Sequence, residues 1–89
     1  MVTAIVLINV ERKEVKKAVD SLMGMEGITE VYPVAGEYDM VAMIRVKDNH
    51  ILSKLITEKI THMESIHHTK TLFALGVHSK IDLDKAYNI

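Results

Sequence analysis

The chain has 89 residues, of which 11 are basic and 12 acidic, with no cysteine and a formal net charge of −1. This length fits one domain, and the lack of cysteine excludes disulfides, thiolate metal sites and cysteine nucleophiles. The balanced charge argues against nucleic acid as the main partner, because phosphate binding needs a basic face. No apolar run approaches the length of a membrane span, and the N-terminus lacks the basic region of a signal peptide. We therefore expect a cytoplasmic protein that contacts neither DNA nor membrane directly.

Residues 2–10 are almost all apolar and rich in β-branched side chains, which predicts a strand buried on both faces. From Glu11 the apolar period becomes that of a helix, and Gly24 is expected to end it. The helical stripe consists of Val15, Ala18, Val19, Leu22 and Met23. Residues 28–35 predict a second strand, in which Pro33 indicates an edge position or a bulge because proline cannot donate to a ladder.

The second half of the chain follows the same order of elements. A turn over residues 36–39 leads into a third strand over residues 40–46, and so short a connection implies an antiparallel hairpin. Asp48 or Asn49 is expected to cap a second helix. The apolar stripe of that helix comprises Leu52, Leu55, Ile56, Ile60 and Met63. A fourth strand is expected over residues 66–77, and in the mixed tail Asp82 could cap one short turn.

An internal repeat supports this order. Met25-Glu26-Gly27-Ile28 and Met63-Glu64-Ser65-Ile66 are offset by 38 residues, and the same offset relates the starts of the first and third strands. Two such βαβ-type halves predict an α+β, ferredoxin-like β-α-β-β-α-β fold. Its helices cover one face of the sheet, whereas the first and third strands are apolar on both faces. Because a large exposed apolar sheet marks an interface, we expect a homodimer with antiparallel four-stranded sheets packed face to face.

The turn Gly36-Glu37-Tyr38-Asp39 is the main candidate for a site, because it crowds two carboxylates and an aromatic hydroxyl beside a glycine. Gly36 can adopt a positive φ and lets a ligand approach the backbone closely. Asp39 could cap backbone N–H groups or hold an ammonium. On local chemistry alone, a plain hairpin connection is the commoner explanation of such residues.

The run from Val34 to Val46 resembles the strand–turn–strand element of the ligand-binding domain of the Lrp/AsnC transcription regulators. The approach to the last strand, from Met63 to Leu72, resembles the turn and threonine-containing strand of the same family. We therefore expect such a domain over residues 1–78 and a tail over residues 79–89 that packs on a neighbouring subunit. Full-length members carry an N-terminal helix-turn-helix. Because the first strand begins here at Val2, the chain resembles a stand-alone effector-sensing version.

The resemblance implies a module that modulates transcription through oligomer assembly. It implies homodimers that assemble further, for example into octameric rings, and full-length family regulators as further partners. The effector implied is an amino acid bound near the hairpin turn. Backbone N–H groups around Gly36 would hold its carboxylate, and Asp39 or Glu37 its ammonium. The expected ligand-binding residues, with the two threonines the weaker candidates, are Ala35, Gly36, Glu37, Tyr38, Asp39, Thr69 and Thr71.

Three further functions are compatible with the same fold and stay open at this point. A small dimeric-barrel enzyme of monooxygenase or isomerase type would place titratable residues in the cleft between sheet and helices, where these strands offer almost none. An effector-free assembly unit and an amino-acid-binding module attached to a metabolic enzyme would have the same physical properties. His67 and His68 point to opposite faces of a strand, so they are not expected to share a metal, and their role is open. No metal, cofactor or catalytic residue is expected.

Overall fold

The computed structural model describes residues 1–80 and confirms the predicted order of elements. The strands are β1 (Val2–Val10), β2 (Ile28–Pro33), β3 (Met40–Val46) and β4 (Ile66–Phe73). The first helical segment consists of a 3₁₀ turn, η1 (Arg12–Glu14), followed by α1 (Val15–Met23). The second consists of α2 (Asn49–Lys54), which continues as a π-helical segment, η2 (Leu55–Ile60).

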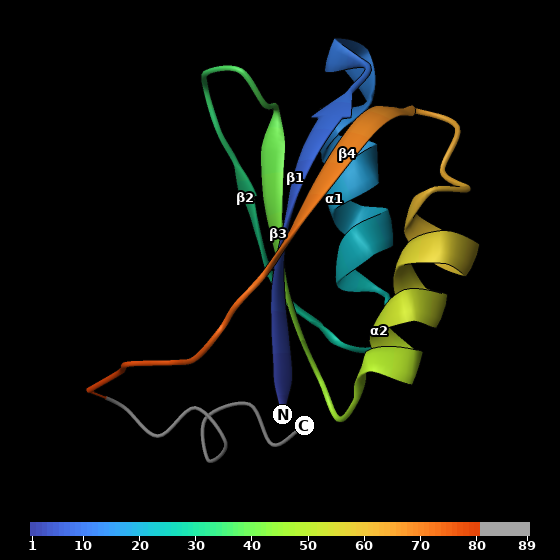
Figure 1. Cartoon of the computed structure of the whole chain (residues 1–89). Helices are drawn as coiled ribbons and strands as arrows, with labels where there is room; N and C mark the ends of the chain where they lie inside the picture. The colour runs from blue at the N-terminus through green and yellow to red at the C-terminus, as the bar shows by residue number, and fades with distance from the viewer. Residues whose placement is uncertain (81–89) are drawn as a thin grey trace.

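The four strands form one antiparallel sheet in the order β2-β3-β1-β4. Both helices pack on the same side of this sheet, as Figure 1 shows. β2 is an edge strand, as Pro33 predicted, and its register with β3 shifts between Ile28 and Glu30. The fold is therefore the expected α+β, ferredoxin-like arrangement of two layers.

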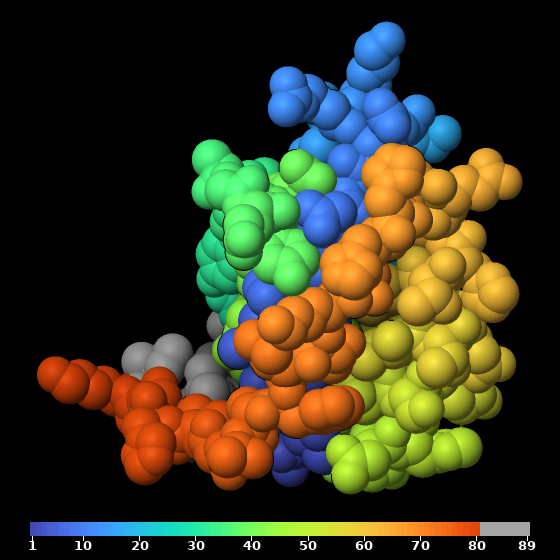
Figure 2. Space-filling model, turned by 45° about the horizontal axis from the view of Figure 1, so that its top comes forward, coloured from blue at the N-terminus to red at the C-terminus, as the bar shows by residue number. Residues whose placement is uncertain are grey.

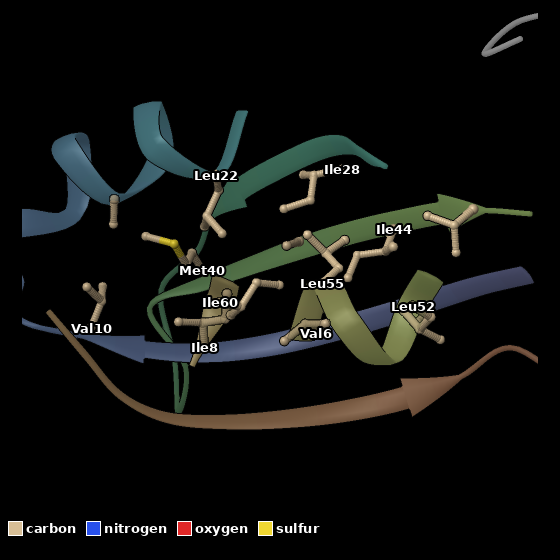
Figure 3. Close-up of a cluster of buried hydrophobic side chains, with 14 residues drawn as sticks. Val6, Ile8, Val10, Leu22, Ile28, Met40, Ile44, Leu52, Leu55 and Ile60 are labelled. Atoms are coloured by element: carbon tan, nitrogen blue, oxygen red, sulfur yellow. The ribbon is translucent and has the colours of Figure 1, made fainter. Parts of the chain in front are cut away.

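The core lies between the sheet and the helices (Figure 3). Alternate residues of the two central strands face it, so these side chains are buried: Ala4, Val6, Ile8 and Val10 of β1, and Met40, Ala42, Ile44 and Val46 of β3. Leu22 of α1 packs on them together with Leu52, Leu55 and Ile60 of the second helical segment. The apolar residues at every second position of the strands and those about 3.6 residues apart in the helices thus face the same core.

The other side of the sheet carries no helix of residues 1–80. Its central side chains are also apolar and form what we call the open face, which consists of Ile5, Leu7, Val41, Met43 and Leu72. The first four are half-buried and Leu72 is exposed. The prediction that β1 and β3 present apolar residues on both faces is thereby confirmed, and the helices of one chain cover only one of those faces.

Two strands end earlier than predicted. β4 ends at Phe73 instead of residue 77, because its neighbour β1 begins at Val2 and the last backbone contact joins the Ala74 N–H to the Thr3 oxygen at 3.0 Å. β2 ends at Pro33, whose partner Met40 is the first residue of β3. A strand ends where the neighbouring strand no longer supplies hydrogen-bonding groups.

The ends of the helices follow their capping residues. Gly24 is the C-cap of α1, and its N–H contacts the Asp20 carbonyl oxygen. Asp48 is the N-cap of α2, where its carboxylate accepts a 2.9 Å hydrogen bond from the Ile51 N–H. Within residues 1–80, neither helix has the length and apolar character needed to span a membrane. The short turn suggested at Asp82 lies outside the described residues.

Candidate functional site

The loop between β2 and β3 is held closed by backbone hydrogen bonds at its base. The Val34 N–H donates to the Asp39 oxygen at 2.9 Å, and the Asp39 N–H donates to the Ile8 oxygen of β1 at 2.9 Å. Gly36 lies at the tip with φ +145°, a conformation that side-chain-bearing residues rarely adopt. A Cβ placed on Gly36 would have no atom of the described residues within 4 Å, so the space beside this backbone is open.

The Asp39 carboxylate fixes this loop to the end of β1. Its Oδ2 accepts a 2.9 Å hydrogen bond from the Val10 N–H and lies 3.5 Å from Asn9 Nδ2. The pairing of β1 with β3 ends at Ile8 and Met40. No further backbone oxygen of β3 is therefore available to the Val10 N–H, and the Asp39 carboxylate accepts its hydrogen bond instead. Asp39 therefore does cap backbone at the hairpin, as local chemistry suggested.

Asn9 is a residue of this site that the sequence-based prediction missed. Its side-chain amide donates to the Glu37 backbone oxygen at 2.8 Å as well as approaching Asp39. It is the one polar side chain in the otherwise apolar run 4–10, and this interruption was the available signal. Asn9 and Asp39 together hold the loop in a single position relative to β1.

The loop retains hydrogen-bonding groups that the described part of the chain does not use. Within residues 1–80, the backbone N–H groups of residues 35–38 find no acceptor, and Asp39 Oδ1 has no donor. Ala35 and Glu37 are exposed, and Tyr38 is half-buried. Unused N–H groups beside an unused carboxylate oxygen offer both halves of a zwitterion a partner.

Thr69 and Thr71 occupy a different place. They pair with Ile8 and Val6, so their side chains lie on the helix-covered side of the sheet, whereas Asp39 contacts the Asn9 side chain on the other side. Within one chain the structure does not bring the threonines to the loop. Figure 2 shows the loop, in green, and β4, in orange, on the same side of the molecule with part of β1, in blue, between them.

Thr71 instead lines a cavity of about 580 Å³ between β4 and the second helical segment. Its other lining residues are Asn49, Leu52, Ser53, Ile56, Thr57 and Phe73. None of these side chains titrates near neutral pH, so the cavity has no group suited to general acid–base catalysis.

The histidine pair does not form a common site. His67 Nε2 lies 3.2 Å from Glu11 Oε2, and both side chains are more than half exposed. His68 is paired with Asn9 across β1 and β4. In the part of the chain that the structure describes, no group of three or more His, Asp or Glu side chains is placed to hold a metal ion.

Comparison with known proteins identifies the family. The model of the Lrp/AsnC ligand-binding domain matches residues 3–81, nearly the whole chain. The chain belongs to the Lrp/AsnC family. The HTH-type transcriptional regulator FL11 of Pyrococcus furiosus is 30% identical over 79 residues, which are 89% of this chain and 52% of that protein. The chain thus spans about half the length of the curated relatives it matches, and those relatives are named as transcriptional regulators.

Solved structures show the same fold in other proteins. A protein of Thermus thermophilus superposes with a TM-score of 0.83 at 34% identity, over 90% of this chain and 100% of that one. A feast or famine regulatory protein of Mycobacterium tuberculosis, solved in complex with L-methionine, gives a TM-score of 0.74 at 24% identity. That match covers 92% of this chain and 56% of the other.

Proposed function

We propose that this Lrp/AsnC domain is a sensor that binds a free amino acid at the β2–β3 loop and modulates transcription through its oligomeric assembly. One observation carries the proposal: in the described part of the chain, the N–H groups of residues 35–38 and Asp39 Oδ1 are unused, and Asp39 Oδ2 and Asn9 hold the loop that contains them. A loop fixed before binding loses little conformational entropy when the ligand arrives. The methionine complex of the mycobacterial protein supports an amino acid as the class of effector.

Within this site, the α-carboxylate of the effector accepts hydrogen bonds from the loop N–H groups around Gly36. Its ammonium pairs with Asp39 Oδ1 or with the exposed Glu37 carboxylate. Tyr38 and Ala35 flank the ligand. Thr69 and Thr71 join the site only if a second copy brings its β4 to the loop, because they lie on the other side of the sheet within one chain.

The assembly starts from a homodimer in which two open faces pack together. The open face is apolar and half-buried in one chain, and a second sheet is the simplest cover of matching shape. Dimers associate further into a ring, for example an octamer, and the same face allows mixed assemblies with full-length family regulators. With a formal net charge of −1, the domain exerts its effect through these partners and does not bind DNA itself.

Thermal melts of the purified protein against each common amino acid test the effector proposal. A ligand that binds the native state raises its stability by about 2.7 kcal/mol at one hundred times its Kd. We expect a selective rise in Tm with one chemical class of amino acid. Flat melts across the whole set would contradict an amino-acid effector and favour the effector-free assembly unit.

Two substitutions of Asp39 separate its structural role from its binding role. Asp39→Asn keeps an oxygen that can accept from the Val10 N–H but removes the negative charge, so we expect a folded protein without the ligand-induced rise in Tm. Asp39→Ala also loses the hydrogen bond, and should lower the free energy of unfolding by about 1 kcal/mol while leaving the dimer intact. Asp20→Asn, on the exposed side of α1, is the matched control and should respond like the wild type. A full ligand-induced rise in Tm in Asp39→Asn would show that Asp39 only holds the hairpin and does not bind the effector.

A further inference from the structure

A further cavity lies at the end of the sheet opposite to the β2–β3 loop. It has a volume of about 600 Å³ and lies where the turn after α1, the end of β3 and the second helical segment meet. Figure 1 shows the start of α2 and the β2–β3 loop at opposite ends of β3. A strand of 7 residues is roughly 20 Å long, so this cavity is separate from the proposed amino-acid site.

The floor of this cavity is apolar and tightly packed. Val46 and Leu55 are buried, and Ile51 beside them is 41% exposed. The backbone of Gly27 forms the adjoining wall, where a Cβ would lie within 3.5 Å of both Val46 and Leu55. The Arg45 N–H donates to the Gly27 oxygen at 2.8 Å, which fixes this wall to β3. The cavity is therefore formed before a ligand binds, and it offers that ligand an apolar surface.

Three lysine side chains line the cavity around this apolar floor. Lys47 follows β3, whereas Lys54 and Lys59 belong to the second helical segment. Within residues 1–80, none of the three forms a salt bridge with a carboxylate. Among the described residues, Glu26 is the one carboxylate that lines the cavity. Three lysines and one glutamate give the lining a formal charge of +2, which favours an anionic ligand.

The π-helical segment η2 brings Lys54 and Lys59 to the same cavity. In an α-helix of 3.6 residues per turn, two residues five positions apart point about 140° away from each other. In a π-helix the N–H of residue i+5 donates to the oxygen of residue i, as the Thr61 N–H does to the Ile56 oxygen at 3.1 Å. Residues five apart then lie about one turn apart, on nearly the same side. Such segments occur frequently at functional sites, and this one gathers two like charges that repel each other unless an anion lies between them.

We propose that this cavity binds a small organic phosphate, a phosphate monoester with an apolar body. The ammonium groups of the three lysines donate to the phosphate oxygens, and the apolar body covers Ile51 and Leu55. A phosphate monoester carries a charge of about −1.5 to −2 at pH 7, which complements the charge of the lining residues. Because the helices lie on the outer side of two sheets packed face to face, the cavity stays accessible in the proposed dimer. This ligand is additional to the amino-acid effector, and its binding does not depend on that effector.

Isothermal titration calorimetry of the full chain in phosphate-free buffer tests the site, with phenyl phosphate as the probe. We expect phenyl phosphate to bind, and phenol to give no heat of binding because it lacks the anionic head. Inorganic phosphate should bind about tenfold more weakly than phenyl phosphate, because it leaves the apolar floor uncovered. Equal affinity for the two phosphates, or no binding of phenyl phosphate, would overturn the proposal.

Lysine variants then assign the binding to this cavity. Lys54→Gln and Lys59→Gln each remove one positive charge at an exposed position, so the protein should stay folded. We expect each substitution to raise the Kd of phenyl phosphate about tenfold, because a charge-assisted hydrogen bond is lost. Lys16→Gln replaces an exposed lysine of α1 outside the cavity, and as the matched control it should bind like the wild type. Equal losses in all three variants would show an effect of net charge alone and contradict a site at this cavity.

Ile51→Ser tests the contribution of the apolar floor. The position is partly exposed, so the substitution should leave the fold and the Kd of inorganic phosphate unchanged. We expect it to weaken the binding of phenyl phosphate, so that the difference in affinity between the two phosphates shrinks. An undiminished preference for phenyl phosphate would show that its ring does not lie on this floor and would contradict the proposed docking. The amino-acid melts and these titrations use different ligands, so the failure of one proposal is distinguishable from the failure of the other.

Discussion

At the scale of single residues, Gly27 has little freedom to change. Its φ is +99°, and a Cβ at this position would lie 2.6 Å from Cγ1 of the buried Val46. Gly27→Ala combines a strained backbone with an overpacked core, so we expect the free energy of unfolding to fall by about 2–3 kcal/mol. Urea unfolding at a fixed protein concentration measures this loss.

Gly24→Ala is the matched control for that substitution. Gly24 has an ordinary φ of −80°, and a Cβ there would meet no described atom closer than the Ser21 oxygen at 3.5 Å. We expect a change within about 0.5 kcal/mol, as for most surface substitutions. Equal losses in the two variants would show that the fit against Val46 is not the cause.

Residue-scale chemistry could be predicted only partly from the sequence. Gly36 and Asp39 stand out because their residue types are those of turns, whereas the hydrogen bonds of Asn9 depend on a loop 28 residues away. Arg45 was missed in the same way. It is buried in β3, and its guanidinium donates to Glu30 at 2.7 Å and to Thr29 at 2.6 Å, which the irregular register of β2 brings to it. Pairings of this kind follow from strand register, which sequence patterns specify only loosely.

At the scale of elements, the start of α2 depends on a single side chain. Asp48 accepts a hydrogen bond from the Ile51 N–H, one of the groups that a helix leaves unpaired at its first turn. Asp48→Ala should lower the free energy of unfolding by about 1 kcal/mol, measured by chemical denaturation. Asp48→Ser, which retains a capping oxygen, should recover most of the loss. Equal destabilisation by both substitutions would argue against the capping role.

The order of the elements could be predicted from the sequence, and their exact ends could not. Apolar side chains at Leu52, Leu55, Ile56 and Ile60 predict one regular helix, yet residues 55–60 form a π-helical segment. The Thr57 hydroxyl donates to the Ser53 oxygen at 2.8 Å, and the Thr61 hydroxyl donates to the Thr57 oxygen at 3.0 Å. These side chains compete with the backbone for the same acceptors, which loosens the helix locally. The apolar period is insensitive to such competition.

At the scale of the whole molecule, the open face decides the state of association. Ile5 lies on this face between Met43 of β3 and Leu72 of β4. Ile5→Glu would bury a carboxylate between two sheets beside these two apolar side chains, so we expect the dimer to dissociate into folded monomers. Sedimentation together with far-ultraviolet circular dichroism measures both properties. Ile51→Glu, on a 41% exposed position of α2, should remain dimeric, and a dimeric Ile5→Glu protein would exclude the face-to-face arrangement.

The strand order also determines when the strands of this chain can pair during synthesis. β1 is made first, but both of its neighbours, β3 and β4, come later, and β4 ends at Phe73. The most apolar strand therefore leaves the ribosome long before either of its pairing partners exists, and its sheet closes only when nearly the whole domain has emerged. Contacts between residues so distant in sequence slow folding, and the apolar, aggregation-prone strand stays exposed until its partners have been made. The nascent chain therefore exposes β1 without a pairing partner until β3 and then β4 have been made.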